Sequence, residues 1–113
     1  MESILNSIKK LLGISEDDDS FDTDVIIHIN TALFRLKQLG VGPSTGFSIY
    51  NDEATWVDFL GDSTNFESVK TYVYAKVRLV FDPPTVSSVI EALNQLITEL
   101  EFCLNVEAET EVN

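Results

Sequence analysis

The sequence is poor in the residues from which most catalytic and metal sites are built. It contains one cysteine, Cys103, and one histidine, His28. A single cysteine excludes an intrachain disulfide framework and suits a reducing compartment. No metal-ligand cluster or glycine-rich phosphate loop is recognisable, so an enzyme is the least favoured class and no cofactor is expected. No apolar run approaches the roughly 20 residues that cross a bilayer, and no signal peptide is recognisable. We expect a soluble intracellular protein with no membrane partner.

Basic residues are scarce as well. The 113 residues include 7 Lys and Arg against 19 Asp and Glu, which gives a net charge of −12. Such a charge opposes non-specific binding to phosphate backbones, whose affinity comes mainly from Lys and Arg. A 44% hydrophobic content nevertheless places the chain among globular proteins, and its length suits one domain. After Arg78 there is no basic residue, whereas these acidic residues follow: Asp82, Glu91, Glu99, Glu101, Glu107, Glu109 and Glu111.

The stretch 65–82, NFESVKTYVYAKVRLVFD, allows two interpretations. Alternation of apolar residues from Val73 to Phe81 is typical of a strand. Spacings of three and four favour a helix, with one apolar stripe made of Phe66, Val69, Val73, Val77 and Val80. A capping box from Thr64 to Glu67 and the length of the segment favour the helix, which Pro83 and Pro84 would end. Tyr72, Ala75 and Leu79 form a second stripe. A helix that is apolar on two sides is buried between elements or in a partner.

Other periodic segments also predict helices. The first covers residues 1–12 with Gly13 as its C-terminal cap, and the second covers about 22–39 with Ser20 or Asp22 as its N-terminal cap. A short helix over 53–60, ended by Gly61, displays Trp56 as a core anchor. The last helix begins near Thr85 or at a Ser88–Glu91 capping box. We predict an all-α fold, a small helical bundle of about four to five helices with one long glycine-rich loop over 40–51. The domain would span residues 1–105, followed by an acidic flexible tail over 106–113.

Two apparent motifs are accidental. The acidic segment from Asp18 lacks the Gly and Glu that a calcium-binding EF-hand loop needs, because Thr23 and Ile29 stand at those positions. Residues 42–46, GPSTG, match G-x-S-x-G, but a helix precedes them and the sole histidine lies upstream, so the context of a nucleophile elbow is missing. Neither segment predicts a site.

The helices have more apolar residues than a single buried face of each helix can hold. Ile27 and Phe34 lie one heptad apart on the far side of the second helix, among polar residues. With Tyr72 and Leu79 they predict a second buried surface. His28 borders the main face, where a packing role is the simpler interpretation.

The order of the segments LGVGPSTGFSI, TWVDFLGD, ESVKTYVYAKVRLVFDPP and SSVIEALNQLITELEFCLNV resembles the head–tail connector proteins of tailed phages and prophages, also called head-completion proteins or adaptors. The resemblance covers nearly the whole chain. It implies a small helical bundle whose copies form a ring beneath the portal protein, extend the DNA channel and provide a platform for a tail-side completion protein. DNA would pass through the channel without specific binding. The protein would lie in the virion at the head–tail interface, and in the host cytoplasm during assembly.

With this resemblance, the surplus apolar residues become expected contact sites. We expect a subunit interface in the ring at Ile27, Phe34, Tyr72 and Leu79. We expect contacts with the portal or the tail at Phe47, Ile49, Tyr50, Phe102, Leu104 and Val106.

An acidic protein-binding module, such as a DNA-mimicking inhibitor, is the alternative function. The net charge supports it, but the acidic residues cluster at turns and in the tail instead of following one face. Competition with a basic DNA-binding protein would distinguish the two.

Overall fold

The computed structural model describes residues 2–62 and 65–112 and is built from helices alone. Within these residues no strand forms, and Ser3 and Thr55 make only an isolated bridge. The all-α prediction is therefore confirmed, and the segment 65–82 is helical. The five helices of the described part are α1 (Ile4–Leu12), α2 (Asp22–Gln38), α3 (Trp56–Leu60), α4 (Phe66–Phe81) and α5 (Ser87–Val112).

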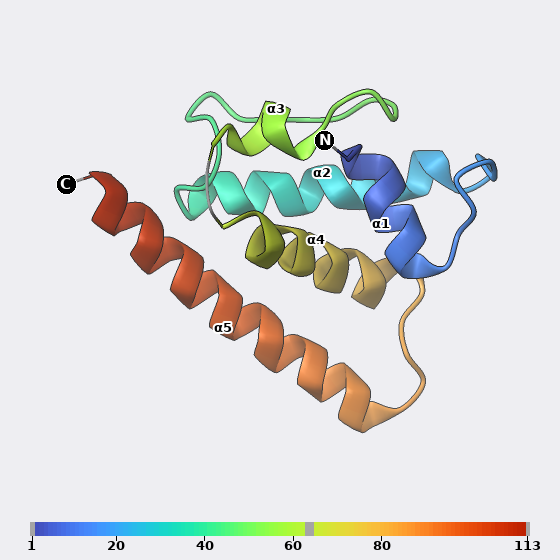
Figure 1. Ribbon diagram of the computed structural model, residues 1–113. Coiled ribbons are helices and arrows are strands. Elements are labelled where there is room, and N and C mark those ends of the chain that lie inside the picture. Colours follow the sequence, from blue (N-terminus) through green and yellow to red (C-terminus); the bar gives the residue numbers. More distant parts are fainter. Residues whose placement is uncertain (1, 63–64, 113) are drawn as a thin grey trace.

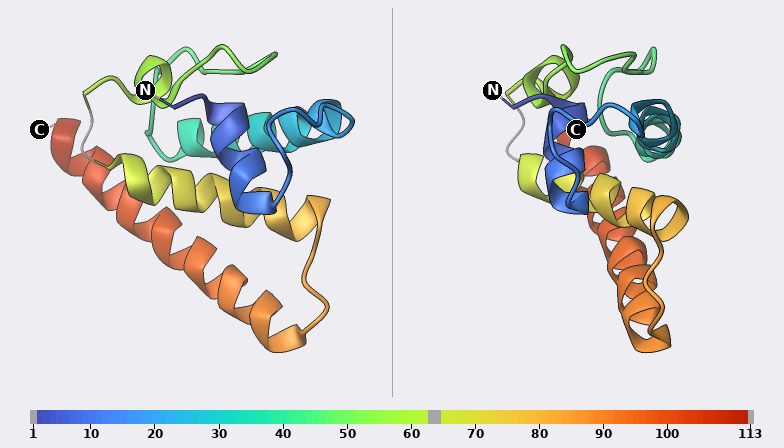
Figure 2. Two further views of the ribbon diagram at one scale, coloured as in Figure 1. Left: turned by 45° about the vertical axis from the view of Figure 1, so that its right-hand side comes forward. Right: turned by 90° about the vertical axis from the view of Figure 1, so that its right-hand side faces the viewer.

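Helix α4 lies in the middle of the bundle (Figure 1). It packs against α2 on one side and against α5 on the other, and α1 contacts both α2 and α4. Seen at right angles in Figure 2, α2 and the first half of α5 lie on opposite sides of α4. The result is a flat molecule with extents of 43 × 35 × 19 Å. The sequence required α4 to be buried between elements or in a partner, and the structure shows burial between elements.

Helix α1 begins and ends as its sequence predicts. The hydroxyl of Ser3 accepts a hydrogen bond from the backbone N–H of Asn6 at 3.2 Å, as expected of an N-terminal cap. Gly13 ends the helix with φ +83°, a left-handed conformation that glycine adopts without steric cost.

An ion pair between a buried lysine and a partly exposed aspartate joins α1 to α2. The Lys9 side chain is almost fully buried, and its Nζ lies 2.8 Å from Oδ1 of Asp22. The same ammonium donates to the backbone carbonyl of Glu16 at 3.2 Å. A buried charge is tolerated when it is paired and hydrogen-bonded, so this contact fixes the connection between α1 and α2.

Several helix starts differ from the predicted ones. Helix α2 begins at Asp22, and neither Ser20 nor Asp22 caps it, since Phe21 is the N-cap residue and makes no side-chain capping bond. Instead, Asp22 serves the ion pair with Lys9. Helix α5 begins at Ser87, which places Ser88 inside its first turn and rules out Ser88 as the N-terminal residue of a capping box. Thr64, which would cap α4, lies outside the described residues.

Helix α3 is shorter than predicted. It begins at Trp56 because Thr55 and Asp58 form a reciprocal capping box there, three residues beyond the predicted start. Gly61 ends it as predicted. Trp56 is buried, packs edge-on against Phe66 with a 5.9 Å separation of ring centroids, and donates from Nε1 to the buried hydroxyl of Ser7 at 2.8 Å. Its predicted role as a core anchor is confirmed.

Helix α5 is continuous from Ser87 to Val112, without a break at the predicted boundary between residues 105 and 106. The side chain of Asn105 donates to the carbonyl of Leu39 at 3.2 Å, and Ala108 lies beside Gly40. The first residues of the predicted tail therefore continue α5, which packs here against the C-terminal end of α2. The flexibility of the tail stays a prediction.

We predict that Asp22→Asn lowers the free energy of unfolding by about 1–3 kcal/mol, because it leaves the ammonium of Lys9 buried without its anion. Urea unfolding measures the loss, and Asp19→Asn, a neutralisation at an exposed neighbour, is the matched control. Adding Lys9→Met to Asp22→Asn should recover part of the loss in a double-mutant cycle. Equal stability of the Asp22→Asn and Asp19→Asn proteins would contradict a structural role for the pair.

Candidate assembly surfaces

Tyr72 belongs to the core of the chain. Its exposed fraction is 0%, and its hydroxyl donates to Oε2 of Glu101 at 2.7 Å. Arg35 approaches the same carboxylate from α2, with Nη2 3.2 Å from Oε1. The prediction that Tyr72 adds to an exposed apolar surface is therefore wrong, because α5 covers the ring and supplies an acceptor for its hydroxyl. This network joins α2, α4 and α5.

The network determines how its members titrate. Partial burial raises the pKa of Glu101, but hydrogen bonds from Arg35 and Tyr72 outweigh it and hold the pKa below its ordinary value. Burial and the hydrogen bond to Glu101 both raise the pKa of the Tyr72 hydroxyl. At neutral pH the network therefore consists of a carboxylate held by a guanidinium and a neutral phenol.

Leu79 is half-buried at the place where α4 and α5 diverge. A mainly apolar pocket of about 220 Å³ lies there, lined by His28, Thr31, Ala32, Lys76, Leu79, Val80, Asn94 and Ile97. His28 thus borders the pocket from α2, in keeping with a packing role. Val86, just before α5, and Val89, in its first turn, are both exposed.

The outer side of α2 carries the two apolar residues that the sequence singled out. Ile27 is 55% exposed and Phe34 is 58% exposed, whereas Val25, Ile29 and Leu36 of the same helix are buried. Ile27 and Phe34 therefore lie on the side of α2 that faces away from α4. The structure leaves both available for contact with another protein.

The glycine-rich loop is fastened to α2 instead of lying free. The side chain of Asn30 donates to the carbonyl of Ile49 at 2.9 Å and accepts from its N–H at 2.8 Å. Gly42 has φ +86°, and a Cβ there would lie 2.3 Å from the ring of Phe59. Only glycine therefore fits at this position. These contacts fix the course of the loop across the outer edge of α2.

The three apolar residues of the glycine-rich loop, Phe47, Ile49 and Tyr50, differ in how far they are exposed. Ile49 is buried in the core and Phe47 packs on Phe59 with ring centroids 5.2 Å apart, so the predicted portal or tail contact at Ile49 is not available in this fold. Tyr50 is 83% exposed. A shallow pocket between α2 and the loop is lined by Phe34, Lys37 and Tyr50 among others. We call Ile27, Phe34, Lys37 and Tyr50 the α2–loop surface.

The C-terminal half of α5 presents a second surface. Phe102 is 71% exposed, and Glu99 and Val106 are also exposed on the side of α5 that faces away from the core. Leu104 points the other way and is buried, which removes it from the predicted portal or tail contacts. The lone Cys103 is exposed beside Phe102. We call Glu99, Phe102 and Val106 the α5 outer stripe.

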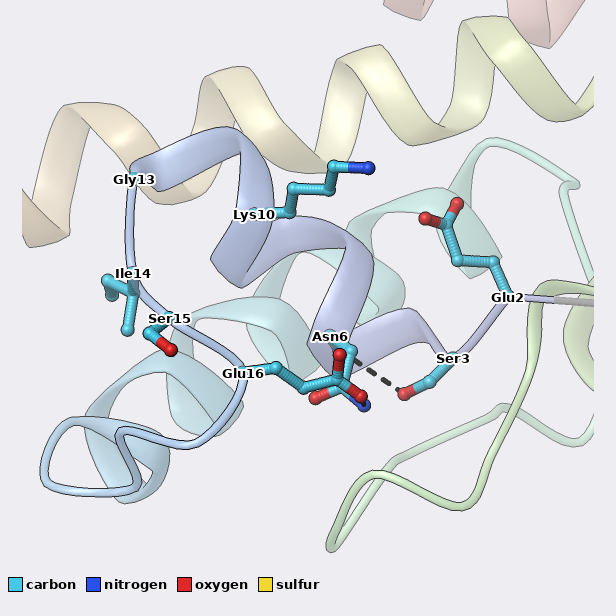
Figure 3. A pocket seen from close by; sticks show the side chains of 8 residues that line it. All are labelled: Glu2, Ser3, Asn6, Lys10, Gly13, Ile14, Ser15 and Glu16. Atoms are coloured by element: carbon cyan, nitrogen blue, oxygen red, sulfur yellow. Dashed lines mark hydrogen bonds between the residues drawn. The ribbon is translucent and has the colours of Figure 1, made fainter.

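A polar depression lies between α1 and the segment that follows it (Figure 3). Glu16 accepts a hydrogen bond from the side chain of Asn6 at 2.9 Å, close to Ser3, while Lys10 and Glu2 lie apart from this group. Asn6 and Glu16 are thus engaged in holding the connection to α2, and Glu2 pairs with Lys70 of α4 at 3.0 Å. Their arrangement converges on no common point at which a ligand atom would be bound.

Among residues 2–62 and 65–112 no three His, Cys, Asp or Glu side chains gather closely enough to hold a metal ion. In the same residues no helix is both long and apolar enough to cross a membrane. Within the described residues, exposed apolar side chains lie on the α2–loop surface, on the α5 outer stripe and, as Val80, Val86 and Val89, around the connection between α4 and α5.

We predict that Tyr72→Phe lowers the free energy of unfolding by about 1–2 kcal/mol, because Glu101 loses a charge-assisted hydrogen bond inside the bundle. Tyr50→Phe removes the same hydroxyl at an exposed position and should leave the urea midpoint unchanged. Equal midpoints for both variants would show that the Tyr72–Glu101 contact contributes nothing.

The depressed pKa of Glu101 also predicts a pH dependence. A lowered carboxyl pKa contributes stability that is present above the unfolded-state pKa, about 4.5, and is lost as the pH falls through the lower folded-state value. Glu101→Gln should therefore flatten the loss of stability in acid, measured by urea unfolding from pH 6 down to pH 3. Glu99→Gln, an exposed control on the same helix, should retain the wild-type profile.

The family comparison agrees with a surface-based role. The model of the phage connector protein family matches residues 4–111, which includes all five helices almost completely. No curated protein and no solved structure matched the chain significantly. Because the match extends over nearly the whole chain, the chain belongs to the phage connector proteins, a family with a structural role.

Proposed function

We propose that this connector protein forms a ring beneath the portal at the capsid vertex, where it extends the DNA channel and provides the platform for a tail-side completion protein. Membership of the phage connector family supports a place in the virion. The ring and the two partners go beyond what the family match states, and they rest on the surfaces of the molecule.

The observation that carries the proposal is the exposure of large apolar side chains on a folded, highly charged chain. Ile27 and Phe34 on α2, Tyr50 on the loop and Phe102 on α5 are all more than half exposed. Phe34 and Tyr50 line one shallow pocket, and apolar side chains that gather at one place on a folded protein mark interaction sites more often than scattered single residues do. Two such surfaces on different helices suit a subunit that has neighbours on more than one side.

The charge of the chain fits a channel component. A protein with a net charge of −12 repels the phosphate backbone wherever its acidic groups face the DNA. DNA would slide through such a ring without being held, which is what passage into and out of a capsid requires.

Electron microscopy of this protein mixed with the portal protein of its own phage tests the proposal. We expect an additional ring density below the portal, coaxial with its channel. A portal that remains bare at saturating connector concentration would overturn the proposal. A monomeric state of the protein alone would not, since some assemblies form only on their template.

We predict that Ile27→Asp leaves the fold intact and abolishes ring formation on the portal, because it places a charge in an apolar contact. Helix content and the urea midpoint should stay within the range of ordinary surface substitutions, about 0.5 kcal/mol. Sedimentation of portal complexes measures ring formation. Val57→Asp, at an exposed valine on α3, is the matched control and should assemble normally.

If the Ile27→Asp and Val57→Asp proteins both assembled on the portal, α2 would have no part in the ring. If both failed while still folded, the defect would come from added charge and not from the position of Ile27.

A further inference from the structure

Charge is distributed unevenly along the chain. Residues 25–51 contain no Asp or Glu, the longest acid-free stretch in a sequence that has 19 acidic residues. Residues 79–113 contain no Lys or Arg. The acid-free stretch comprises α2 from Val25 onward and the glycine-rich loop, whereas Asp22 and Asp24 lie in the first turn of α2. The base-free stretch comprises the end of α4, the connection after it and α5. The two stretches meet at the C-terminal end of α2, where Arg35 pairs with Glu101 and Asn105 bonds to the carbonyl of Leu39, and the groups that point away from this contact remain for a partner.

Each of these surfaces also carries apolar side chains that a partner could bury. On the α2–loop surface, Phe34 and Tyr50 are exposed in the pocket that Lys37 also lines, and Ile27 is exposed two turns before Phe34 on the same side of α2. The α5 outer stripe has Phe102 and Val106 exposed beside the carboxylate of Glu99. An aromatic anchor with a charge at its edge is typical of the centre of a protein–protein contact.

The cation available on α2 is Lys37. Arg35 is held by Glu101 of its own chain at 3.2 Å, so its charge is already compensated within the bundle. Lys37 is exposed and lines the same shallow pocket as Phe34 and Tyr50. A carboxylate that reached this pocket from another molecule would meet a positive charge and no acidic neighbour from residues 25–51.

Repulsion between copies decides how they can meet. Two chains that each carry −12 repel each other, so close contact is favoured only where like charges are not brought together. A contact between two α5 outer stripes would place Glu99 near its own counterpart. A contact between the α2–loop surface of one copy and the α5 outer stripe of the next avoids this and pairs Lys37 with Glu99.

We propose that adjacent copies of this chain associate head to tail, with the α2–loop surface of one copy bound to the α5 outer stripe of the next. This rests on the proposed ring and names the two faces that build it. Contacts between two different surfaces generate rings when the rotation closes, whereas contacts between identical surfaces stop at a dimer. Phe102 and Val106 are thereby assigned to the contact between copies and not to the portal.

Two variants, each with one damaged face, test the pairing. Phe34→Asp spoils the α2–loop surface and Phe102→Asp spoils the α5 outer stripe, and both residues are exposed, so both variants should keep the wild-type urea midpoint. Under conditions in which the wild type assembles, alone at high concentration or on its portal, each variant should weaken self-association at least about thirtyfold. An equimolar mixture should form heterodimers and nothing larger, since one intact pair of faces remains. Native mass spectrometry of the mixture, with one variant isotopically labelled, identifies the heterodimer.

The proposed pair of Lys37 in one copy and Glu99 in the next is tested in the same assay. Lys37→Glu should weaken self-association about tenfold, and Lys37→Arg should not. Lys10→Glu, at an exposed lysine on α1, is the control for added negative charge and should have a smaller effect than Lys37→Glu.

The outcomes separate this inference from the proposed function. If either Phe→Asp variant still formed rings as the wild type does, or if the mixture contained no heterodimer, the pairing of these two faces would be overturned. The proposed ring itself would stand. A wild-type protein that forms no ring on its portal would overturn the proposed function, and the pairing with it.

Discussion

The structure depends on the burial of α4 on both of its long sides. Its sequence has one apolar stripe too many for a surface helix, and α2 on one side and α5 on the other cover both stripes except at their C-terminal ends, where Val80 is exposed and Leu79 is half-buried. Tyr72 shows how complete this cover is, because its ring is fully buried and its hydroxyl reaches Glu101 at 2.7 Å. A buried phenol needs such an acceptor, and the carboxylate in turn is held by Arg35.

This arrangement leaves the exposed apolar residues on the outside of the flanking helices. One exposed face lies on the outer side of α2, with Phe34, and the other lies on the side of α5 away from the core, with Phe102. The acid-free part of the chain supplies the first surface and the base-free part supplies the second. A subunit with two unlike surfaces can repeat head to tail.

Periodicity along the sequence was sufficient to predict most of the fold. The spacing of apolar residues located the helices, and Gly13 and Gly61 end α1 and α3 as expected. Among the expected contact residues, Ile27, Phe34, Tyr50 and Phe102 are exposed, whereas Tyr72, Ile49 and Leu104 are buried in the chain itself.

The errors arise where partners are distant in the sequence. Glu101, which satisfies Tyr72, lies 29 residues away, and Asn30, which fastens Ile49, lies 19 residues away. Helical periodicity tells which residues share a face but not which other helix covers it. The start of α2 shows the same limit, because Asp22 pairs with Lys9 of α1 in place of capping its own helix. No pattern within a single helix predicts such a contact with another helix.

Hydroxyl-radical footprinting of the free chain and of intact virions tests most directly the claim that the exposed faces of α2 and α5 are covered by neighbours. The account predicts that Phe34 and Phe102 are modified rapidly in the free chain and become protected together in the virion, while Val57 on α3 changes less. Phe34 and Phe102 that remain as reactive in the virion as in the free chain would contradict it.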